Sequence, residues 1–194
     1  MNEIAAIVLA AGQSKRMGAP KLLLPWGKTT VLGQVLITLQ EAGLTRILVV
    51  VGAYQEQVRA EALAHGASTV FNPDYAEGEM LSSLQVGLRS LAPETRAALI
   101  CLGDQPQIRS ETIRLLCRAF QNSGSLLVIP TYQHRRGHPW LIARPLWQEA
   151  LALTRETTPR HLLEKYSDQI QYVLADASVL QDLDTPEDYH LSHP

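Results

Sequence analysis

The sequence predicts an α/β fold of three layers, in which helices cover both faces of a mostly parallel sheet. Short apolar runs alternate along the chain with segments whose apolar residues recur at helical spacing. The runs are apolar throughout instead of alternating with polar residues, which is typical of strands covered on both faces. The length of 194 residues, of which 46% are hydrophobic, predicts one domain with a sizeable buried core.

Four apolar runs are the predicted strands, at residues 4–9, 47–51, 98–102 and 126–129. Because helical segments separate them, right-handed crossovers between parallel neighbours are expected. In such sheets ligands bind beyond the carboxyl ends of the strands. The candidate loops are therefore residues 10–26, 103–108 and an excursion at 131–139.

The helices are predicted from apolar stripes and capping residues. Stripes lie at residues 31–39, 54–65, 80–91 and 113–120. Thr29 or Thr30 is a suitable N-cap for the first stripe, and Gly43 stops it. Ser110 is the predicted cap of the last stripe.

The composition excludes several classes of protein. A net charge of -2 argues against a nonspecific nucleic-acid binder, and 19% charged residues argue against disorder. Cys101 and Cys117 lie in apolar segments, so we expect buried free thiols in the reducing cytoplasm. The apolar run at residues 4–11 is too short to span a bilayer, and Glu3 stands where a secretion signal would be basic.

The charged residues are unevenly distributed. Residues 4–40 and 112–148 contain no acid, whereas the chain from Glu164 onward carries seven acids and one base. The basic segments could converge on a polyanionic ligand, with carboxylates left to hold a metal. The alternative is an ordinary solvated surface.

The loop after the first strand has the chemistry of an anion site. Small residues at Ala10, Ala11 and Gly12 let the backbone approach a ligand, and Arg16 and Lys21 add positive charge. Two familiar nucleotide motifs are rejected. No G-x-G-x-x-G follows the strand, and the Gly-Lys-Thr that ends at Thr29 lacks the earlier glycine of a P-loop.

This loop resembles the signature of the MobA-like nucleotidyltransferases. It reads Leu-Ala-Ala-Gly-x-Ser-x-Arg-Met-Gly from Leu9 to Gly18, then Pro-Lys and Leu-Leu-Pro. The resemblance implies a Rossmann-like nucleotidyltransferase fold. It also implies a nucleotide-binding role for Leu9, Ala10, Ala11, Gly12, Ser14, Arg16 and Lys21.

The Ala-Ala-Gly form is most similar to the molybdenum cofactor cytidylyltransferase branch of that family. The guanylyltransferase branch shows Leu-Ala-Gly-Gly at this place, so Ala11 indicates a pyrimidine base. The methyl group of Ala11 would narrow the space for a purine.

Two further segments extend the resemblance to the expected nucleotide and acceptor sites. In residues 72–84 it implies that Gly78, Ser82 and Ser83 lie near the nucleotide, the alternative being a capped helix start. In Arg-Arg-Gly-His-Pro it implies that Arg136 and His138 lie at the acceptor, the alternative for His138 being a hydrogen-bonded loop residue.

Two aspartates are implied as metal ligands. Asp104 follows the third predicted strand, where a carboxylate can reach the crevice and bind Mg²⁺, the alternative being an Asx-turn. Asp184, in the Asp-Leu-Asp-Thr-Pro-Glu-Asp ending, is the implied second ligand, whereas Asp182 is expected to be structural. Thr185 is expected to cap the helix that follows.

The resemblance implies transfer of CMP from CTP to a phosphate-bearing acceptor with release of pyrophosphate. Arg16, Lys21 and Asp104 are the expected catalytic residues, Mg²⁺ is the expected cofactor, and molybdenum-bearing molybdopterin is the expected acceptor. Handover to a molybdenum hydroxylase is also implied. The alternatives are a guanylyltransferase, a cytidylyltransferase with another acceptor, or a noncatalytic module that delivers a cofactor.

Overall fold

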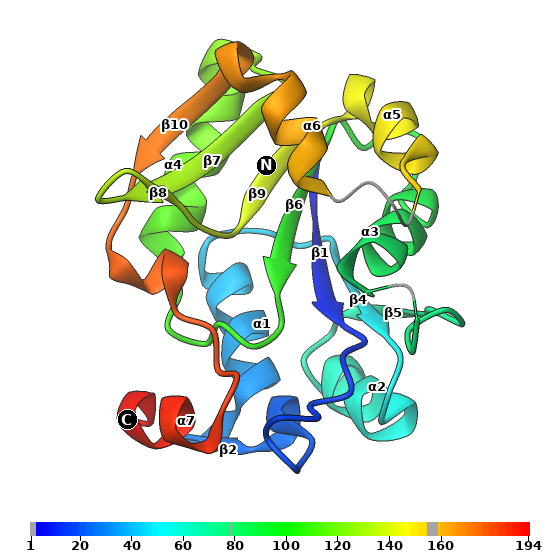
Figure 1. Ribbon diagram of the computed structural model, residues 1–194, viewed down its shortest axis with the longest axis vertical. Helices are drawn as coiled ribbons and strands as arrows, with labels where there is room; N and C mark the ends of the chain where they lie inside the picture. The colour runs from blue at the N-terminus through cyan, green and yellow to red at the C-terminus, as the bar shows by residue number, and fades with distance from the viewer. Residues whose placement is uncertain (1–2, 78, 155–158) are drawn as a thin grey trace.

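The computed structural model describes residues 3–77, 79–154 and 159–194 (Figure 1). Its main sheet has the strand order β10-β7-β9-β6-β1-β4-β5, and β8 pairs with β7. The strands are β1 (Ile4–Ala10), β4 (Ile47–Val51), β5 (Ser68–Phe71), β6 (Ala97–Leu102), β7 (Leu127–Tyr132), β8 (Arg135–Arg136), β9 (Trp140–Ala143) and β10 (Ile170–Leu174). A separate hairpin joins β2 (Pro25–Trp26) and β3 (Thr29–Thr30).

The sheet is mostly parallel, as predicted. β1 lies between β4 and β6 and is parallel to both, and the pairs β4–β5 and β7–β10 are also parallel. β9 is the exception, because it runs antiparallel between β6 and β7. All four predicted strands are present, whereas β5, β9 and β10 were not predicted.

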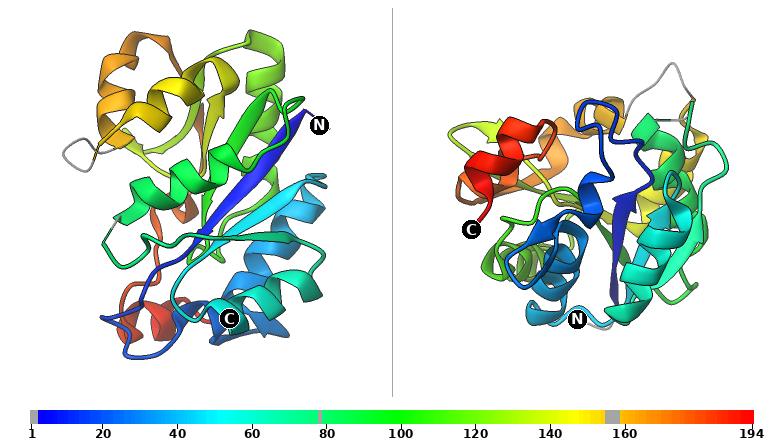
Figure 2. Two further views of the ribbon diagram at one scale, coloured as in Figure 1. Left: turned by 90° about the vertical axis from the view of Figure 1, so that its right-hand side faces the viewer. Right: turned by 90° about the horizontal axis from the view of Figure 1, so that it is seen from below.

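Helices cover both faces of the sheet, which confirms the three layers (Figures 1 and 2). They are α1 (Val31–Glu41), α2 (Gln55–Ala64), α3 (Glu79–Arg89), α4 (Ser110–Ser123), α5 (Trp147–Ala152), α6 (Pro159–Lys165) and α7 (Pro186–Ser192). In β1, Ala6 and Val8 belong to the core that contains residues of α1, α2 and α4, whereas Ile7 belongs to the core that contains residues of α3, α5 and α6. Both faces are therefore buried, which explains the continuous apolar run.

Of the N-caps predicted for α1 and α4, the first is correct and the second is wrong. Thr30 caps α1, because its hydroxyl accepts a hydrogen bond from the Gly33 amide at 2.9 Å. The prediction that Ser110 caps α4 is wrong, since Ser110 is the first helical residue and Arg109 holds the N-cap position. The Ser110 hydroxyl instead accepts from the Arg114 guanidinium at 2.9 Å.

The structure adds detail to two other predicted segments, the end of α3 and the excursion at 131–139. α3 ends at Arg89 instead of residue 91, because the Ser90 amide bonds back to Gly87 in a tighter turn. The excursion at 131–139 is a hairpin from β7 to β8, turned by Gln133 (φ 47°) and His134 (φ 63°).

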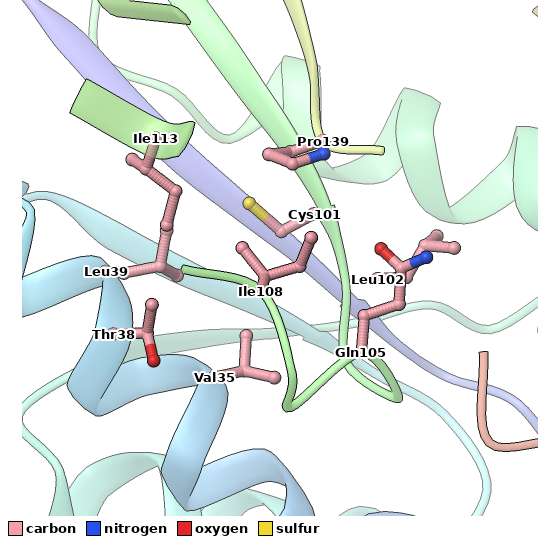
Figure 3. A pocket seen from close by; sticks show the side chains of 9 residues that line it. All are labelled: Val35, Thr38, Leu39, Cys101, Leu102, Gln105, Ile108, Ile113 and Pro139. Carbon is pink, nitrogen blue, oxygen red and sulfur yellow. The ribbon is translucent and has the colours of Figure 1, made fainter. Parts of the chain in front are cut away.

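A small apolar cavity lies between β6, α1 and α4 (Figure 3). Its volume is about 10 Å³, and Val35, Leu39, Cys101 and Ile113 are among its lining residues. That volume is at the lower limit for a single water molecule. The cavity is therefore a packing gap of the core and no ligand site.

The prediction of two buried free thiols is confirmed for Cys101 and Cys117. Burial raises the pKa of the Cys117 thiol to about 11 and also raises that of Cys101. No helix among the described residues is long and apolar enough to cross a bilayer.

Gly52, directly after β4, is a position where we expect a side chain to be costly. A Cβ atom there would lie 2.5 Å from Cβ of Tyr75 and 2.7 Å from the carbonyl oxygen of Ala11. We expect Gly52→Ala to lower the free energy of unfolding by about 1–3 kcal/mol, measured by urea denaturation. Gly12→Ala is the matched control, because its Cβ would meet no atom within 4 Å. Equal stability of the two variants would contradict this packing.

Candidate active site

The candidate site lies where β1 and β6 end (Figure 1). These strands are parallel neighbours with Leu9 opposite Leu102, so the loops that follow them meet at one edge of the sheet. The chain near the C-terminus returns to the same edge, because the Leu183 amide donates to the carbonyl oxygen of Asp104 at 3.1 Å. Figure 2 (right) views this end of the molecule, with α7 beside the loop after β1.

Four charged side chains from three distant parts of the chain meet there. The Lys21 ammonium lies 2.5 Å from Oδ2 of Asp104 and 3.1 Å from Oδ1 of Asp184. The Arg16 guanidinium lies 2.8 Å from Oδ2 of Asp184. We call Arg16, Lys21, Asp104 and Asp184 the charge cluster. The sequence singled out all four, and the structure brings them together.

The members of the charge cluster differ in exposure. The Lys21 side chain is 14% exposed, whereas that of Arg16 is 71% exposed. Burial opposes the positive charge of Lys21, but the carboxylates of Asp104 and Asp184 outweigh it and raise the pKa of the ammonium above its ordinary value. The Lys21 side chain therefore stays positively charged, and the Arg16 side chain is a cation that solvent and ligands can reach.

The loop after β1 holds the cations in place. The Ser14 hydroxyl accepts a hydrogen bond from the Lys21 amide at 3.3 Å. Ser14 itself has φ 50°, and its carbonyl oxygen accepts from the amides of Met17 and Gly18 at 3.1 and 3.2 Å. This turn places Arg16 and Lys21 on the same side of the loop, facing the carboxylates.

Asp184 is held by the start of α7. Oδ2 of Asp188 accepts hydrogen bonds from the backbone amides of Asp184 and Thr185, at 3.2 and 2.8 Å. Thr185 caps α7 as predicted, in a capping box with Asp188. The hydroxyl of Tyr189 then donates to the carbonyl oxygen of Pro25 at 2.5 Å, which ties α7 to the hairpin that follows Lys21.

A cavity of about 300 Å³ opens next to the charge cluster. We call it the loop cavity; its lining residues are Gly12, Gln13, Ser14, Lys15, Arg16, Lys21, Tyr75 and Asp184. Gly12, Ser14, Arg16 and Lys21 are thus open to the cavity where the sequence predicted a nucleotide. Tyr75 was not predicted, although it stands in the segment of residues 72–84 that the resemblance placed near the nucleotide.

Leu9, Ala10 and Ala11, which were also predicted to bind the nucleotide, are not among the lining residues of the loop cavity. Ala10 and Ala11 are buried, and the Ala11 methyl lies against Gly52. The carbonyl oxygen of Leu9 accepts from the amide of Gly103 at 3.1 Å. These contacts give the three residues a packing role at the ends of β1, β4 and β6.

The two serines lie at the start of α3. The Asn72 amide donates to the hydroxyl of Ser82 at 2.8 Å and to that of Ser83 at 3.0 Å. Ser83 is buried, so the structure favours its structural role, whereas Ser82 is half-buried and stays a candidate for nucleotide contact. Gly78 lies outside the described residues.

Arg136 lies in β8, and His138 lies in the short segment between β8 and β9. The Arg136 guanidinium lies over the Tyr172 ring, 5.6 Å from its centre. The His138 ring stacks on Trp140 at 4.4 Å, and its amide donates to the carbonyl oxygen of Val179. Their predicted acceptor role stays a prediction.

Asp182 has a different environment from Asp184. Gln105 donates to its Oδ1 at 2.5 Å. Desolvation and then the negative charge of Asp104 raise the pKa of the Asp182 carboxyl above its ordinary value. These contacts match the structural role expected for Asp182, which holds the chain before Asp184 against the loop after β6.

The charge cluster fits a divalent cation. One ammonium contacts oxygens of both Asp104 and Asp184, so the two carboxylates face a common cation position. Among residues 3–77, 79–154 and 159–194 no group of three or more His, Cys, Asp or Glu gathers into a metal site. Mg²⁺ is commonly bound by one or two carboxylates, and substrate phosphates and water complete its coordination shell.

A family model described as "MobA-like NTP transferase domain" matches residues 6–170 of this chain. The chain belongs to the MobA-like family. Its Rossmann-like nucleotidyltransferase fold, which the resemblance implied, is confirmed by similar solved structures. The chain is 30% identical to the molybdenum cofactor cytidylyltransferase of Escherichia coli K12, over 97% of this chain and 95% of the relative.

Two solved structures match nearly the whole chain. The Rv0371c protein of Mycobacterium tuberculosis has a TM-score of 0.84 and 30% identity, covering 97% of this chain and 96% of that one. The same mycobacterial protein has also been solved in complex with manganese. A nucleotidyl transferase from Methanothermobacter has a TM-score of 0.83 and 25% identity, covering 100% of this chain and 97% of that one.

Proposed function

We propose that this protein transfers CMP from CTP to a phosphate-bearing acceptor and releases pyrophosphate. The observation that carries the proposal is the charge cluster beside the loop cavity, where Arg16 and Lys21 face Asp104 and Asp184. Such a site suits a ligand that brings several negative charges together with a divalent cation. The activity of the Escherichia coli relative supports cytidylyl transfer as the specific reaction.

The catalytic work is mainly positioning and charge stabilisation. Gly12 and Ser14 lie at the loop cavity, where the backbone can approach the nucleotide closely. Arg16 and Lys21 would bind the triphosphate and offset the charge that builds on the leaving pyrophosphate. The acceptor phosphate attacks the α-phosphorus directly. It is already an anion near pH 7, so the reaction needs neither a covalent intermediate nor a general base.

Asp104 and Asp184 are the proposed ligands of Mg²⁺. When bound, the ion would supply positive charge at the phosphates that the protein's cations do not cover. The manganese complex of the mycobacterial relative supports a divalent cation in this family. Tyr189 and Asp188 would keep Asp184 in place for that role through their contacts with Pro25 and the Asp184 amide.

The proposed acceptor is molybdopterin that bears molybdenum, and the support is the name of the Escherichia coli relative. Arg136 and His138 are the proposed acceptor-binding residues, since both lie on or next to the hairpin that β8 forms with β7. A molybdenum hydroxylase is the proposed recipient of the product. The buried free thiols support the cytoplasm as the proposed location.

A nucleotide panel tests the proposed function. We expect only CTP, among CTP, GTP, ATP and UTP with Mg²⁺, to support pyrophosphate release with the molybdopterin acceptor. Isothermal titration with each nucleotide provides the matching affinities. Tight GTP binding without CTP binding would contradict the pyrimidine assignment, and CTP binding without any turnover would favour a noncatalytic delivery module.

A further inference from the structure

Lys21 lies in the space between the two proposed metal ligands. Its ammonium contacts Asp104 at 2.5 Å and Asp184 at 3.1 Å, on one oxygen of each carboxylate. We infer that in the free protein Lys21 takes the place of the divalent cation, and that a bound triphosphate draws Lys21 away so that metal and nucleotide bind cooperatively. The inference rests on the proposed function, because it takes Asp104 and Asp184 as the metal ligands.

The geometry makes the two cations competitors for the same carboxylate oxygens. An ion shared by Oδ2 of Asp104 and Oδ1 of Asp184 would lie about 2.1 Å from each oxygen. The Lys21 ammonium is already within hydrogen-bond distance of the same two atoms, so it holds the oxygens that the ion would bind. We therefore expect binding of the metal at this position to displace Lys21.

The charges point to the same conclusion. Asp104 and Asp184 carry two negative charges, and Lys21 and Arg16 pair with them at 3.1 Å or less. The carboxylates are thus already neutralised, and little attraction remains for a free divalent cation. The nucleotide-free protein should consequently bind the metal weakly.

The loop cavity offers Lys21 another partner. Lys21 and Arg16 both line this cavity, and both also contact carboxylates of the charge cluster. A lysine side chain is a point charge on a flexible four-carbon stem, so its ammonium can turn from Asp104 toward phosphate oxygens without movement of the backbone. Phosphates in the cavity would then free both carboxylates, and by linkage each ligand would tighten the binding of the other by the same factor.

A lysine that only binds phosphate or only braces the fold leads to a different expectation. Removal of a lysine that stands away from the carboxylates in the free protein would leave the affinity for metal alone unchanged, or would lower it if the carboxylates lost their position. Removal of a lysine that occupies the metal position should raise that affinity. Mn²⁺ binding without nucleotide therefore separates the two roles.

The test measures Mn²⁺ binding to the full chain by the electron paramagnetic resonance signal of the free ion, with no nucleotide present. We expect Lys21→Met to bind Mn²⁺ about tenfold more tightly than the wild type, within the usual range of coupling between sites. Lys28→Met is the matched control, because it removes one exposed positive charge outside the site and should leave Mn²⁺ binding unchanged. Lys21→Arg keeps a cation in place and should stay close to the wild type.

Each outcome decides one point. Equal or weaker Mn²⁺ binding by folded Lys21→Met overturns the inference and leaves the proposed function standing. If Lys21→Met is unfolded by circular dichroism, the same comparison with Lys21→Gln decides. Tight binding that persists in the double variant Lys21→Met, Asp104→Asn places the metal elsewhere, and the proposed metal site then fails.

Discussion

Asp104→Asn should abolish the release of pyrophosphate from CTP and acceptor in the presence of Mg²⁺. The substitution keeps the size of the side chain but removes the charge that pairs with Lys21 and is proposed to hold the metal. Loss of one such electrostatic group costs about 10²–10³ in rate, and loss of a metal ligand is expected to reach at least the upper end. A coupled pyrophosphate assay measures the effect.

The matched control for this prediction is Asp182→Asn. Asp182 lies two residues from Asp184 and accepts from Gln105, but it belongs to neither the charge cluster nor the lining of the loop cavity. It should keep activity near that of the wild type. Wild-type turnover by Asp104→Asn would remove Asp104 from the metal site, whereas equal losses in both variants would point to a disturbed fold.

Arg16→Ala should lower kcat/KM for CTP by about 10²–10³. Arg16 is the most exposed member of the charge cluster, at 71%, so it can reach the phosphates while its loop stays in place. Its loss removes charge stabilisation of the leaving pyrophosphate, and kcat should fall together with kcat/KM because that charge grows in the transition state.

Steady-state kinetics with varied CTP separates the two parameters. Lys28→Ala removes one exposed positive charge outside the site and should change neither of them. An increase in KM with kcat unchanged would mean that Arg16 binds the nucleotide equally in the ground state and the transition state. That result would take Arg16 out of the catalytic set and leave it as a binding residue.

The predictable part of the fold came from local patterns. The runs that became β1, β4, β6 and β7 are apolar because both faces of each strand are covered. Burial on both faces makes consecutive residues apolar, and such a run is recognisable in the sequence. β9 was not predicted, although all four of its residues are buried. Its antiparallel insertion between β6 and β7 depends on the β7–β8 hairpin reversing the chain, which short-range periodicity does not reveal.

The predictable part of the site was the choice of residues. A loop of small residues with Arg16 and Lys21, and aspartates at 104 and 184, were identifiable from composition, position and family resemblance. The sequence did not distinguish Ser82 from Ser83, since both hydroxyls follow the same motif. Burial separates them, because Ser83 lies in the interior beside Asn72.

The sequence by itself determined the layered α/β architecture, the strand ends that carry the site and the kinds of charge that meet there. Only the tertiary structure decided that Lys21 lies between Asp104 and Asp184, which are 83 and 163 positions away along the chain. The physical reason is that burial and helical spacing act between near neighbours. An ion pair depends on how the sheet and α7 bring distant segments to the same edge.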